Sequence, residues 1–101
     1  MAVLLEQTMP EGVGVDVLDE VSSEMGVDKN PPAGLIVHVH FAENGRTRIV
    51  DVWESAEAYE TFLREKLMPA MQTVAGRHGM SMEGQEPETS MTEVATVVRG
   101  S

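Results

Sequence analysis

Residues 34–67 read GLIVHVHFAENGRTRIVDVWESAEAYETFLREKL, and this stretch predicts a β-hairpin that runs directly into a helix. Asn44 and Gly45 lie between two runs rich in β-branched residues. This dipeptide suits a two-residue type I′ turn, because both central residues of that turn need positive φ. A two-residue loop pairs Glu43 with Arg46, so the turn fixes the register of the whole hairpin.

The predicted register divides the hairpin into two faces. It pairs His38 with Asp51, Ile36 with Trp53, His40 with Ile49, Val39 with Val50 and Val37 with Val52. One face is aliphatic and consists of Leu35, Val37, Val39, Phe41, Val50 and Val52. The other is apolar but carries groups capable of proton chemistry, and it consists of Ile36, His38, His40, Ile49, Asp51 and Trp53. Neither face has the polar alternation of a solvated strand, so both faces must be covered.

Length and composition indicate one small domain, residues 1–101, with a single core. The chain has 17 Asp and Glu against 7 Lys and Arg, a formal net charge of -10 that disfavours nucleic acids and anionic membranes as partners. It has no cysteine, which excludes disulfides, thiolate nucleophiles and thiolate metal sites and makes a cytoplasmic location the default. No apolar run is long enough to span a bilayer, and we expect no targeting segment.

Elements on either side of the hairpin follow from local signals. Residues 2–9 predict a first strand, and residues 15–25 predict a helix with an apolar stripe that ends at Gly26. Ser55 is the expected N-cap of the second helix, and Pro69 predicts a kink or break within it. Residues 77–89 predict a loop in which Met80 and Met82 can line a pocket wall. Residues 92–99, which are rich in valine, predict the last strand.

The resulting order, β-α-β-β-α-β, is typical of the ferredoxin-like α+β fold, a four-stranded antiparallel sheet with two helices on one face. The helices cover only one side of the sheet. Because the hairpin is apolar on both sides, the uncovered side would form a large exposed patch. A second copy packed sheet against sheet is the usual way to bury such a patch, so we expect a homodimer.

Several residues after the hairpin resemble the antibiotic biosynthesis monooxygenase-like family. They are the run Asp51-Val52-Trp53-Glu54-Ser55, then Tyr59 and Phe62, and the segment Leu67-Met68-Pro69-Ala70. The resemblance covers nearly the whole chain, and it implies a dimeric α/β barrel. The family includes cofactor-free anthrone oxygenases, haem-degrading oxygenases and small aldehyde-handling proteins.

The resemblance also implies roles for individual positions. Trp53 and Tyr59 match the active-site tryptophan and tyrosine of the anthrone oxygenases. Ile49 stands where those enzymes have an asparagine, and Thr73 stands near their helix arginine, with Arg77 one turn on.

The haem degraders match less well. Phe62 and Gln72 occupy the positions of their helix tryptophan and axial histidine, although Gln7 matches their first-strand amide. Without that histidine haem has no axial ligand, so we expect no cofactor.

His38 opposite Asp51 is the strongest chemical feature of the sequence. A carboxylate beside an imidazole fixes its tautomer and raises its basicity, which suits removal of a proton from an acidic C–H or a phenol. A satisfied cross-strand pair in the core explains the same residues equally well. His38 and His40 with Asp51 also form a two-histidine, one-carboxylate set, but nothing in the sequence supplies partners that would orient it around a metal ion, so we expect no metal site.

The sequence therefore predicts a cofactor-independent enzyme, either a monooxygenase or a cyclase/isomerase. Its substrate is expected to be a hydrophobic, aromatic or polyketide-like small molecule held between helices and sheet. The candidate catalytic residues are His38, Asp51, Trp53 and Tyr59, and the candidate substrate-binding residues are Gln7, Ile36, His40, Ile49 and Phe62. A non-catalytic module that binds a small molecule on the same scaffold is the alternative.

Overall fold

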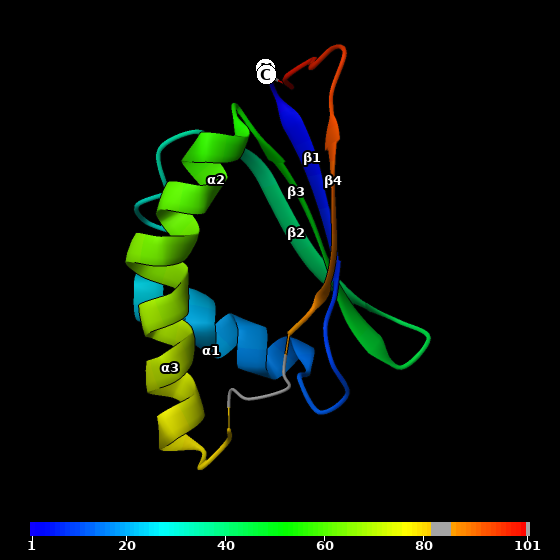
Figure 1. The fold of residues 1–101 in the computed structure, drawn as a ribbon. Coiled ribbons are helices and arrows are strands. Elements are labelled where there is room, and N and C mark those ends of the chain that lie inside the picture. Colours follow the sequence, from blue (N-terminus) through cyan, green and yellow to red (C-terminus); the bar gives the residue numbers. More distant parts are fainter. Residues whose placement is uncertain (82–85, 101) are drawn as a thin grey trace.

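The computed structural model describes residues 1–81 and 86–100 and shows a four-stranded antiparallel sheet with helices on one face (Figure 1). The elements are β1 (Val3–Thr8), α1 (Val15–Met25), β2 (Leu35–Glu43), β3 (Arg46–Trp53), α2 (Ala56–Phe62), η1 (Leu63–Leu67), α3 (Met68–Arg77) and β4 (Glu88–Glu93). The strands lie in the order β2-β3-β1-β4. This confirms the predicted ferredoxin-like α+β fold. No helix in the described part of the chain is both long and apolar enough to cross a bilayer.

The hairpin of β2 and β3 has the predicted turn and nearly all of the predicted register. Asn44 has φ 53° and Gly45 has φ 77°, as a type I′ turn requires. The pairs run as predicted from the turn back to Val37 opposite Val52. A bulge between Leu35 and Val37 then shifts the register, so Leu35, and not Ile36, lies opposite Trp53. The bulge turns Leu35 away from the aliphatic face and packs it beside Trp53.

Helix α1 has the predicted bounds. Gly26 follows it in the left-handed region, at φ 69°, and its N–H donates to the carbonyl of Ser22 across 2.9 Å. Leu18 and Val21 form the buried stripe of the helix, whereas Asp19 stays exposed. The stripe packs over the sheet and against α3, which places α1 along one side of the space between helices and sheet.

The second helical segment is continuous from Ala56 to Arg77 but changes its hydrogen-bond pattern before Pro69. The Ser55 hydroxyl accepts the N–H of Ala58 at 3.0 Å, which confirms the predicted N-cap. The π-helical turn η1 separates α2 from α3 and ends just before Pro69. Because proline has no N–H to donate, a locally wider turn accommodates it without ending the helix. The predicted kink therefore takes the form of a π-helical turn.

The last strand differs from the prediction. Strand β4 is polar and exposed along its length, and it ends at Glu93, whereas residues 92–99 were expected to form it. It pairs antiparallel with β1, from Val3 opposite Glu93 to Thr8 opposite Glu88. Backbone pairing with the free edge of β1 outweighs the β propensity of the later valines, and Val98 is left exposed.

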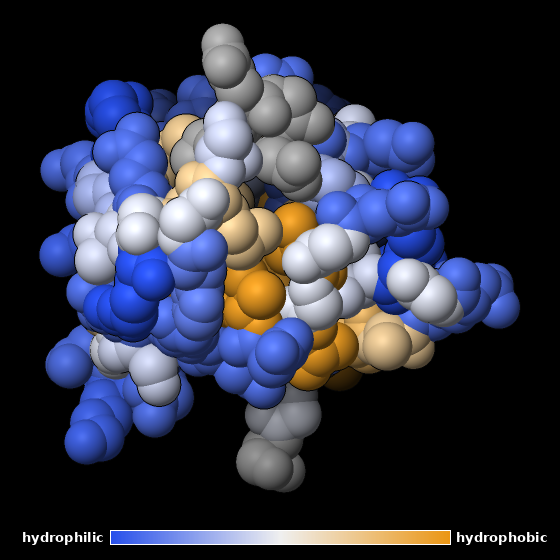
Figure 2. All heavy atoms as spheres, turned by 90° about the horizontal axis from the view of Figure 1, so that it is seen from below, coloured by the Kyte–Doolittle hydropathy of each residue, from blue (hydrophilic) through white to orange (hydrophobic). Residues whose placement is uncertain are grey.

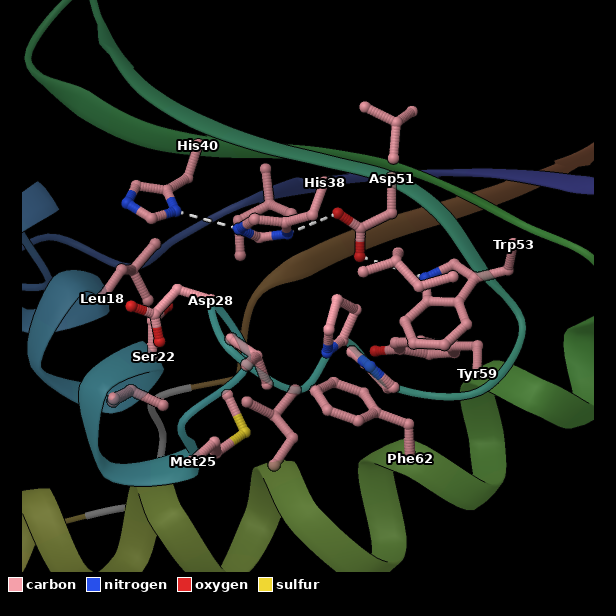
Figure 3. A pocket seen from close by; sticks show the side chains of 18 of the residues that line it. Leu18, Ser22, Met25, Asp28, His38, His40, Asp51, Trp53, Tyr59 and Phe62 are labelled. Carbon is pink, nitrogen blue, oxygen red and sulfur yellow. Dashed lines mark hydrogen bonds and ion pairs between the residues drawn. The ribbon is translucent and has the colours of Figure 1, made fainter. Parts of the chain in front are cut away.

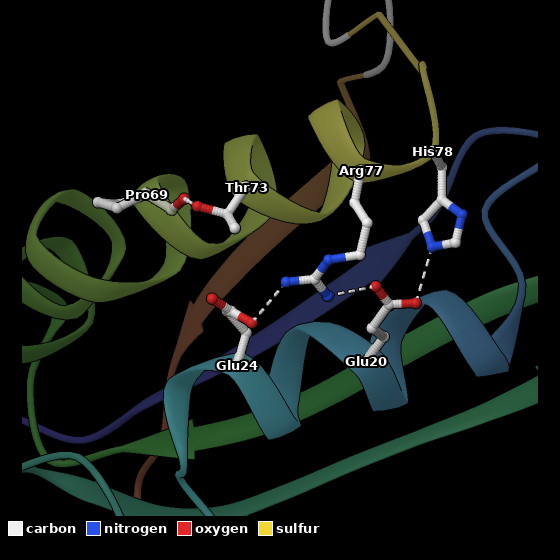
Figure 4. Close-up of polar contacts among 6 residues, drawn as sticks. All are labelled: Glu20, Glu24, Pro69, Thr73, Arg77 and His78. Carbon is white, nitrogen blue, oxygen red and sulfur yellow. Dashed lines mark hydrogen bonds and ion pairs between the residues drawn. The ribbon is translucent and has the colours of Figure 1, made fainter.

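Charged side chains link the end of α3 to α1 (Figure 4). Arg77 Nη1 donates to Glu20 at 2.7 Å and Arg77 Nη2 donates to Glu24 at 3.0 Å. His78, which follows α3 directly, lies 2.8 Å from the second oxygen of Glu20. The hydrogen bonds from His78 and then Arg77 lower the pKa of Glu20.

An apolar cluster lies at the end of the molecule seen in Figure 2, where apolar side chains gather at the centre and hydrophilic ones surround them. As predicted, Met80 lines a cavity wall, here that of a small cavity of about 40 Å³ that Val17 and Val74 also line. This cavity is separate from the larger pocket described below. Met82, the other methionine predicted to line a pocket, lies outside the described residues.

The sheet face away from the helices carries the exposed aliphatic residues. Val37 and Val39 are each 46% exposed. The face is less uniform than predicted, because Arg48 lies opposite Phe41 near the hairpin turn, with its guanidinium over the ring. Arg48 also pairs with Glu43 at 3.3 Å. The apolar patch is therefore bounded by charges at its turn end.

Candidate functional site

A pocket of about 570 Å³ lies between the helices and the sheet (Figure 3). Its apolar walls come from α1, from the loop before β2, and from the sheet and α2. They include Leu18, Val21, Met25, Pro31, Leu35, Ile36 and Phe62. Its polar groups are Gln7, Ser22, Asp28, His38, His40, Asp51 and Tyr59. A largely apolar cavity with a small number of polar groups is typical of a small-molecule site.

Three aromatic rings form one end of the pocket. Trp53 is 1% exposed and meets Tyr59 edge to face, with ring centroids 5.6 Å apart. Phe62 also packs against Trp53, at a centroid distance of 5.2 Å. Tyr59 and Phe62 are three residues apart, so they project from one side of α2 toward the end of β3. The cluster offers aromatic edges and faces suited to packing against an aromatic ligand.

A buried carboxylate joins the sheet wall to this cluster. Asp51 Oδ1 lies 2.6 Å from His38 Nδ1, and Trp53 Nε1 donates to Asp51 Oδ2 at 3.1 Å. The pairing of His38 with Asp51 follows from the hairpin register, and Trp53 lies two residues further along β3 on the same face. The buried carboxylate thus has a partner on each oxygen, which holds the imidazole in one orientation.

The imidazoles continue the line of contacts beyond Asp51. His38 Nε2 lies 2.9 Å from His40 Nδ1, and His40 Nε2 lies 2.7 Å from Oδ1 of Asp19 on α1. Sequence reasoning missed Asp19, because the helical pattern places it on the side facing water, where its carboxylate indeed remains largely exposed. Only the packing of α1 over β2 brings it to His40, and no local sequence signal marks that contact.

Tyr59 is the other titratable group of the aromatic end. Burial raises the pKa of its phenol, the negative charge of Asp51 raises it further, and a hydrogen bond with Gln7 acts in the opposite direction. The phenol is therefore protonated at neutral pH and can serve as a hydrogen-bond donor. Gln7 is itself buried and held by a hydrogen bond from its Nε2 to the hydroxyl of Thr89, at 3.1 Å.

The structure places all the predicted site residues in the lining of this one pocket. They are His38, Asp51, Trp53, Tyr59, Gln7, Ile36, His40, Ile49 and Phe62. Sequence reasoning missed the opposite wall, which α1 and the proline-containing loop before β2 supply. Arg77, one turn beyond the position of the anthrone oxygenase arginine, pairs with α1 glutamates and does not line the pocket.

The two histidines are not arranged around a common point. In residues 1–81 and 86–100 no group of three His, Asp or Glu side chains is placed to hold a metal ion. Nε2 of His38 faces Nδ1 of His40, so the two imidazoles contact each other and the flanking carboxylates. Such an arrangement suits proton transfer better than metal binding.

The pocket lining also does not fit haem. Phe62, at the position of the haem degraders' helix tryptophan, lines the pocket. Gln72, at the position of their axial histidine, is exposed and does not line it. The described lining residues include no arginine or lysine that could pair with the propionates. Both histidine rings that reach the pocket are already hydrogen-bonded at each nitrogen.

Comparisons with known proteins agree with this architecture. No protein-family model and no curated protein sequence matches the chain. Among solved structures, an antibiotic biosynthesis monooxygenase from Deinococcus radiodurans, described as putative, superposes with a TM-score of 0.62 at 10% identity, covering 100% of this chain and 99% of that one. The chain has the antibiotic biosynthesis monooxygenase fold. The predicted resemblance to that family is thus confirmed as a likeness of fold.

Two further structures show which kinds of active site this fold holds in other proteins. SnoaB from Streptomyces nogalater is a cofactor-independent oxygenase, and a variant of it matches with a TM-score of 0.58 at 12% identity over 96% of this chain and 95% of that one. A variant of MhuD has two manganese protoporphyrin IX molecules bound per active site. It matches with a TM-score of 0.59 at 18% identity over 99% of this chain and 100% of that one. The fold therefore hosts both cofactor-free and porphyrin-bound sites, and the residues of the pocket must decide between them.

Proposed function

We propose that the protein is a cofactor-independent enzyme, either a monooxygenase or a cyclase/isomerase, acting on a hydrophobic aromatic or polyketide-like small molecule. The observation that carries the proposal is the 2.6 Å contact between His38 and Asp51 on the wall of an otherwise apolar pocket. A positioned imidazole with a carboxylate partner is the arrangement that general-base catalysis uses. The likeness of fold to a cofactor-independent oxygenase supports the same class of chemistry.

In the proposed reaction the bound molecule displaces His40 from Nε2 of His38. His38, oriented by Asp51, then removes a proton from an acidic C–H or phenolic O–H of that molecule. The electron pair stays on the substrate as a delocalised anion, which the rings of Trp53, Tyr59 and Phe62 hold in place. A cyclase or isomerase lets this anion attack, or be reprotonated, at a second carbon. A monooxygenase lets it reduce O₂, with one oxygen atom ending in a new carbonyl and the other in water.

Turnover of a panel of anthrones and enolisable polyketides tests the proposal. We expect His38→Ala to lower the rate by about a hundredfold or more, the range that a positioned general base contributes. His78→Ala is the matched control, because His78 contacts Glu20 at the far end of α3 and does not line the pocket. Full activity of His38→Ala would refute the assignment of the base.

The proposal includes a homodimer in which two sheets pack face to face to form a dimeric α/β barrel. Two half-exposed valines, Val37 and Val39, lie on the edge strand β2, on the sheet face that the helices leave open. Each apolar side chain of this size contributes about 1.5–3 kcal/mol when it is fully buried. A second copy of the same face is a self-complementary cover for such a patch.

A non-catalytic small-molecule binding module remains the competing function, and one observation favours it. Ile49 lines the pocket where anthrone oxygenases have an asparagine, and Arg77 is engaged elsewhere. The oxyanion-handling groups of that mechanism are thus missing from the described lining. Native mass spectrometry of the purified protein separates the two functions: a co-purified ligand that is unchanged on incubation in air favours binding alone.

A further inference from the structure

The pocket is buried at its aromatic end and open to solvent at its other end. Trp53 and Tyr59, at the aromatic end, are 1% and 6% exposed. Asp28, in the loop after α1, also lines the pocket but is exposed, and the side chain of His38 is 34% exposed. Figure 3 shows Asp28 and Ser22 beside α1, away from Trp53 and Tyr59. Because burial favours apolar surface, a ligand places its rings at the aromatic end and leaves its other end beside Asp28.

Asp28 and Ser22 have hydrogen-bonding capacity that the protein does not use. In residues 1–81 and 86–100 no protein group bonds to the carboxylate of Asp28 or to the hydroxyl of Ser22. Asp51, the other carboxylate of the lining, has a protein partner on each oxygen. An ionised carboxylate only accepts hydrogen bonds, so the open end of the pocket offers a ligand an unused acceptor.

Charges around the pocket disfavour an anionic ligand. The described lining contains two carboxylates, those of Asp28 and Asp51, and neither arginine nor lysine. Lys29 follows Asp28 in the sequence but does not line the pocket. The chain as a whole has a formal net charge of -10. A negatively charged group at the open end would meet the like charge of Asp28, whereas a hydroxyl or an ammonium group would find an acceptor there.

We propose that the ligand is an aromatic molecule with a hydrogen-bond donor, either a hydroxyl or a protonated amino group, at the end away from its buried rings, and that Asp28 selects this donor. The inference rests on the proposed function, for which it names the substrate class. Asp28 accepts the donated hydrogen, and the hydroxyl of Ser22 is available for a second bond from the same side of the pocket. Asp28 is thus a specificity-determining residue that takes no part in proton removal by His38.

Binding of four anthracenes that differ in one ring substituent tests the inference. The substituent is a methyl, hydroxymethyl, aminomethyl or carboxylate group. The chain has 1 tryptophan, and it lies at the aromatic end, so quenching of Trp53 fluorescence reports binding.

The titrations are made at about pH 8, where free imidazole is neutral and an alkylamine is charged. We expect the hydroxymethyl and aminomethyl compounds to bind about tenfold tighter than the methyl compound, the lower end of the range for a hydrogen bond to a charged group. The carboxylate should bind more weakly than the methyl compound, because it meets the like charge of Asp28.

A substitution at Asp28 separates its charge from its role as an acceptor. Asp28→Asn keeps an oxygen but not the charge, so the hydroxymethyl compound should keep most of its advantage while the aminomethyl compound loses its own. Asp16→Asn is the matched control, the same charge change at an exposed position of α1 outside the pocket lining, and should leave all four affinities unchanged.

Three results would overturn the inference. They are equal binding of the four compounds by the wild type, binding of none of them, and an undiminished preference of Asp28→Asn for the aminomethyl over the carboxylate compound. None of these measurements involves turnover. A protein that selects the donors through Asp28 but converts no anthrone would support the inference and count against the proposed enzymatic function. Conversion of anthrones without discrimination among the four compounds would do the reverse.

Discussion

Trp53 donates its indole N–H to Oδ2 of Asp51 across 3.1 Å, and both residues are buried. Trp53→Phe removes the donor and leaves a buried carboxylate oxygen without its partner. We expect the free energy of unfolding to fall by about 1–3 kcal/mol because a buried acceptor loses its hydrogen-bond partner. The smaller ring of phenylalanine lowers it further. Urea denaturation followed by circular dichroism measures the change.

The control for this prediction is the same substitution in an Asp51→Leu background, where no acceptor remains to be left unpaired. Trp53→Phe should cost less stability there, by a coupling energy of about 0.5–3 kcal/mol. An equal cost in both backgrounds would show that the indole N–H does not stabilise Asp51.

The contacts of Glu20 predict a loss of stability in acid. Its pKa lies below the ordinary value of 4.5 because His78 and Arg77 donate to its carboxylate. A carboxyl group whose pKa is lowered by folding stabilises the protein fully above its unfolded pKa, and loses that contribution as pH falls through its folded pKa. Urea midpoints measured from neutral pH downward should therefore fall less steeply in Glu20→Gln than in the wild type. Glu60→Gln, an exposed change on α2, should leave the slope unaltered.

Tyr59 predicts a change at the opposite end of the pH range. Its burial raises the phenol pKa above the ordinary value of 10.0, so the folded state keeps a proton that the unfolded state loses. The contribution of Tyr59 to stability is therefore constant below the ordinary pKa and is lost as pH rises through the folded pKa. Because the chain has 1 tyrosine, an absorbance titration of tyrosinate reports this residue alone. Half-ionisation at or below the ordinary value would contradict the burial of the hydroxyl.

Val39 tests the proposed dimer. Sedimentation at micromolar concentration should show a dimer for the wild type. Val39→Asp should weaken dimerisation by about a hundredfold or more, because burying an unpaired carboxylate costs several kcal/mol. Thr61→Asp, an exposed position on α2, is the control. A wild-type monomer, or an intact dimer in Val39→Asp, would contradict the assignment of this face.

The hairpin was predictable from sequence because one dipeptide, Asn44-Gly45, sets its register and thereby the His38–Asp51 contact. The bulge before Val37 was not predictable, since no glycine or proline marks it within the strand. The position of β4 depends on pairing with β1, a long-range contact that outweighs local propensity. Asp19 was missed for a similar reason, because only the packing of α1 against β2 brings its carboxylate to His40.

Exchange of the acidic methylene hydrogens of anthrone for deuterium, measured by NMR under nitrogen, tests the proposed base most directly. Without O₂ the assay isolates proton removal from any later step. The wild type should speed exchange by about a hundredfold or more over buffer, His38→Ala should lose this acceleration, and His78→Ala should keep it. Equal exchange by the wild type and His38→Ala would contradict the account.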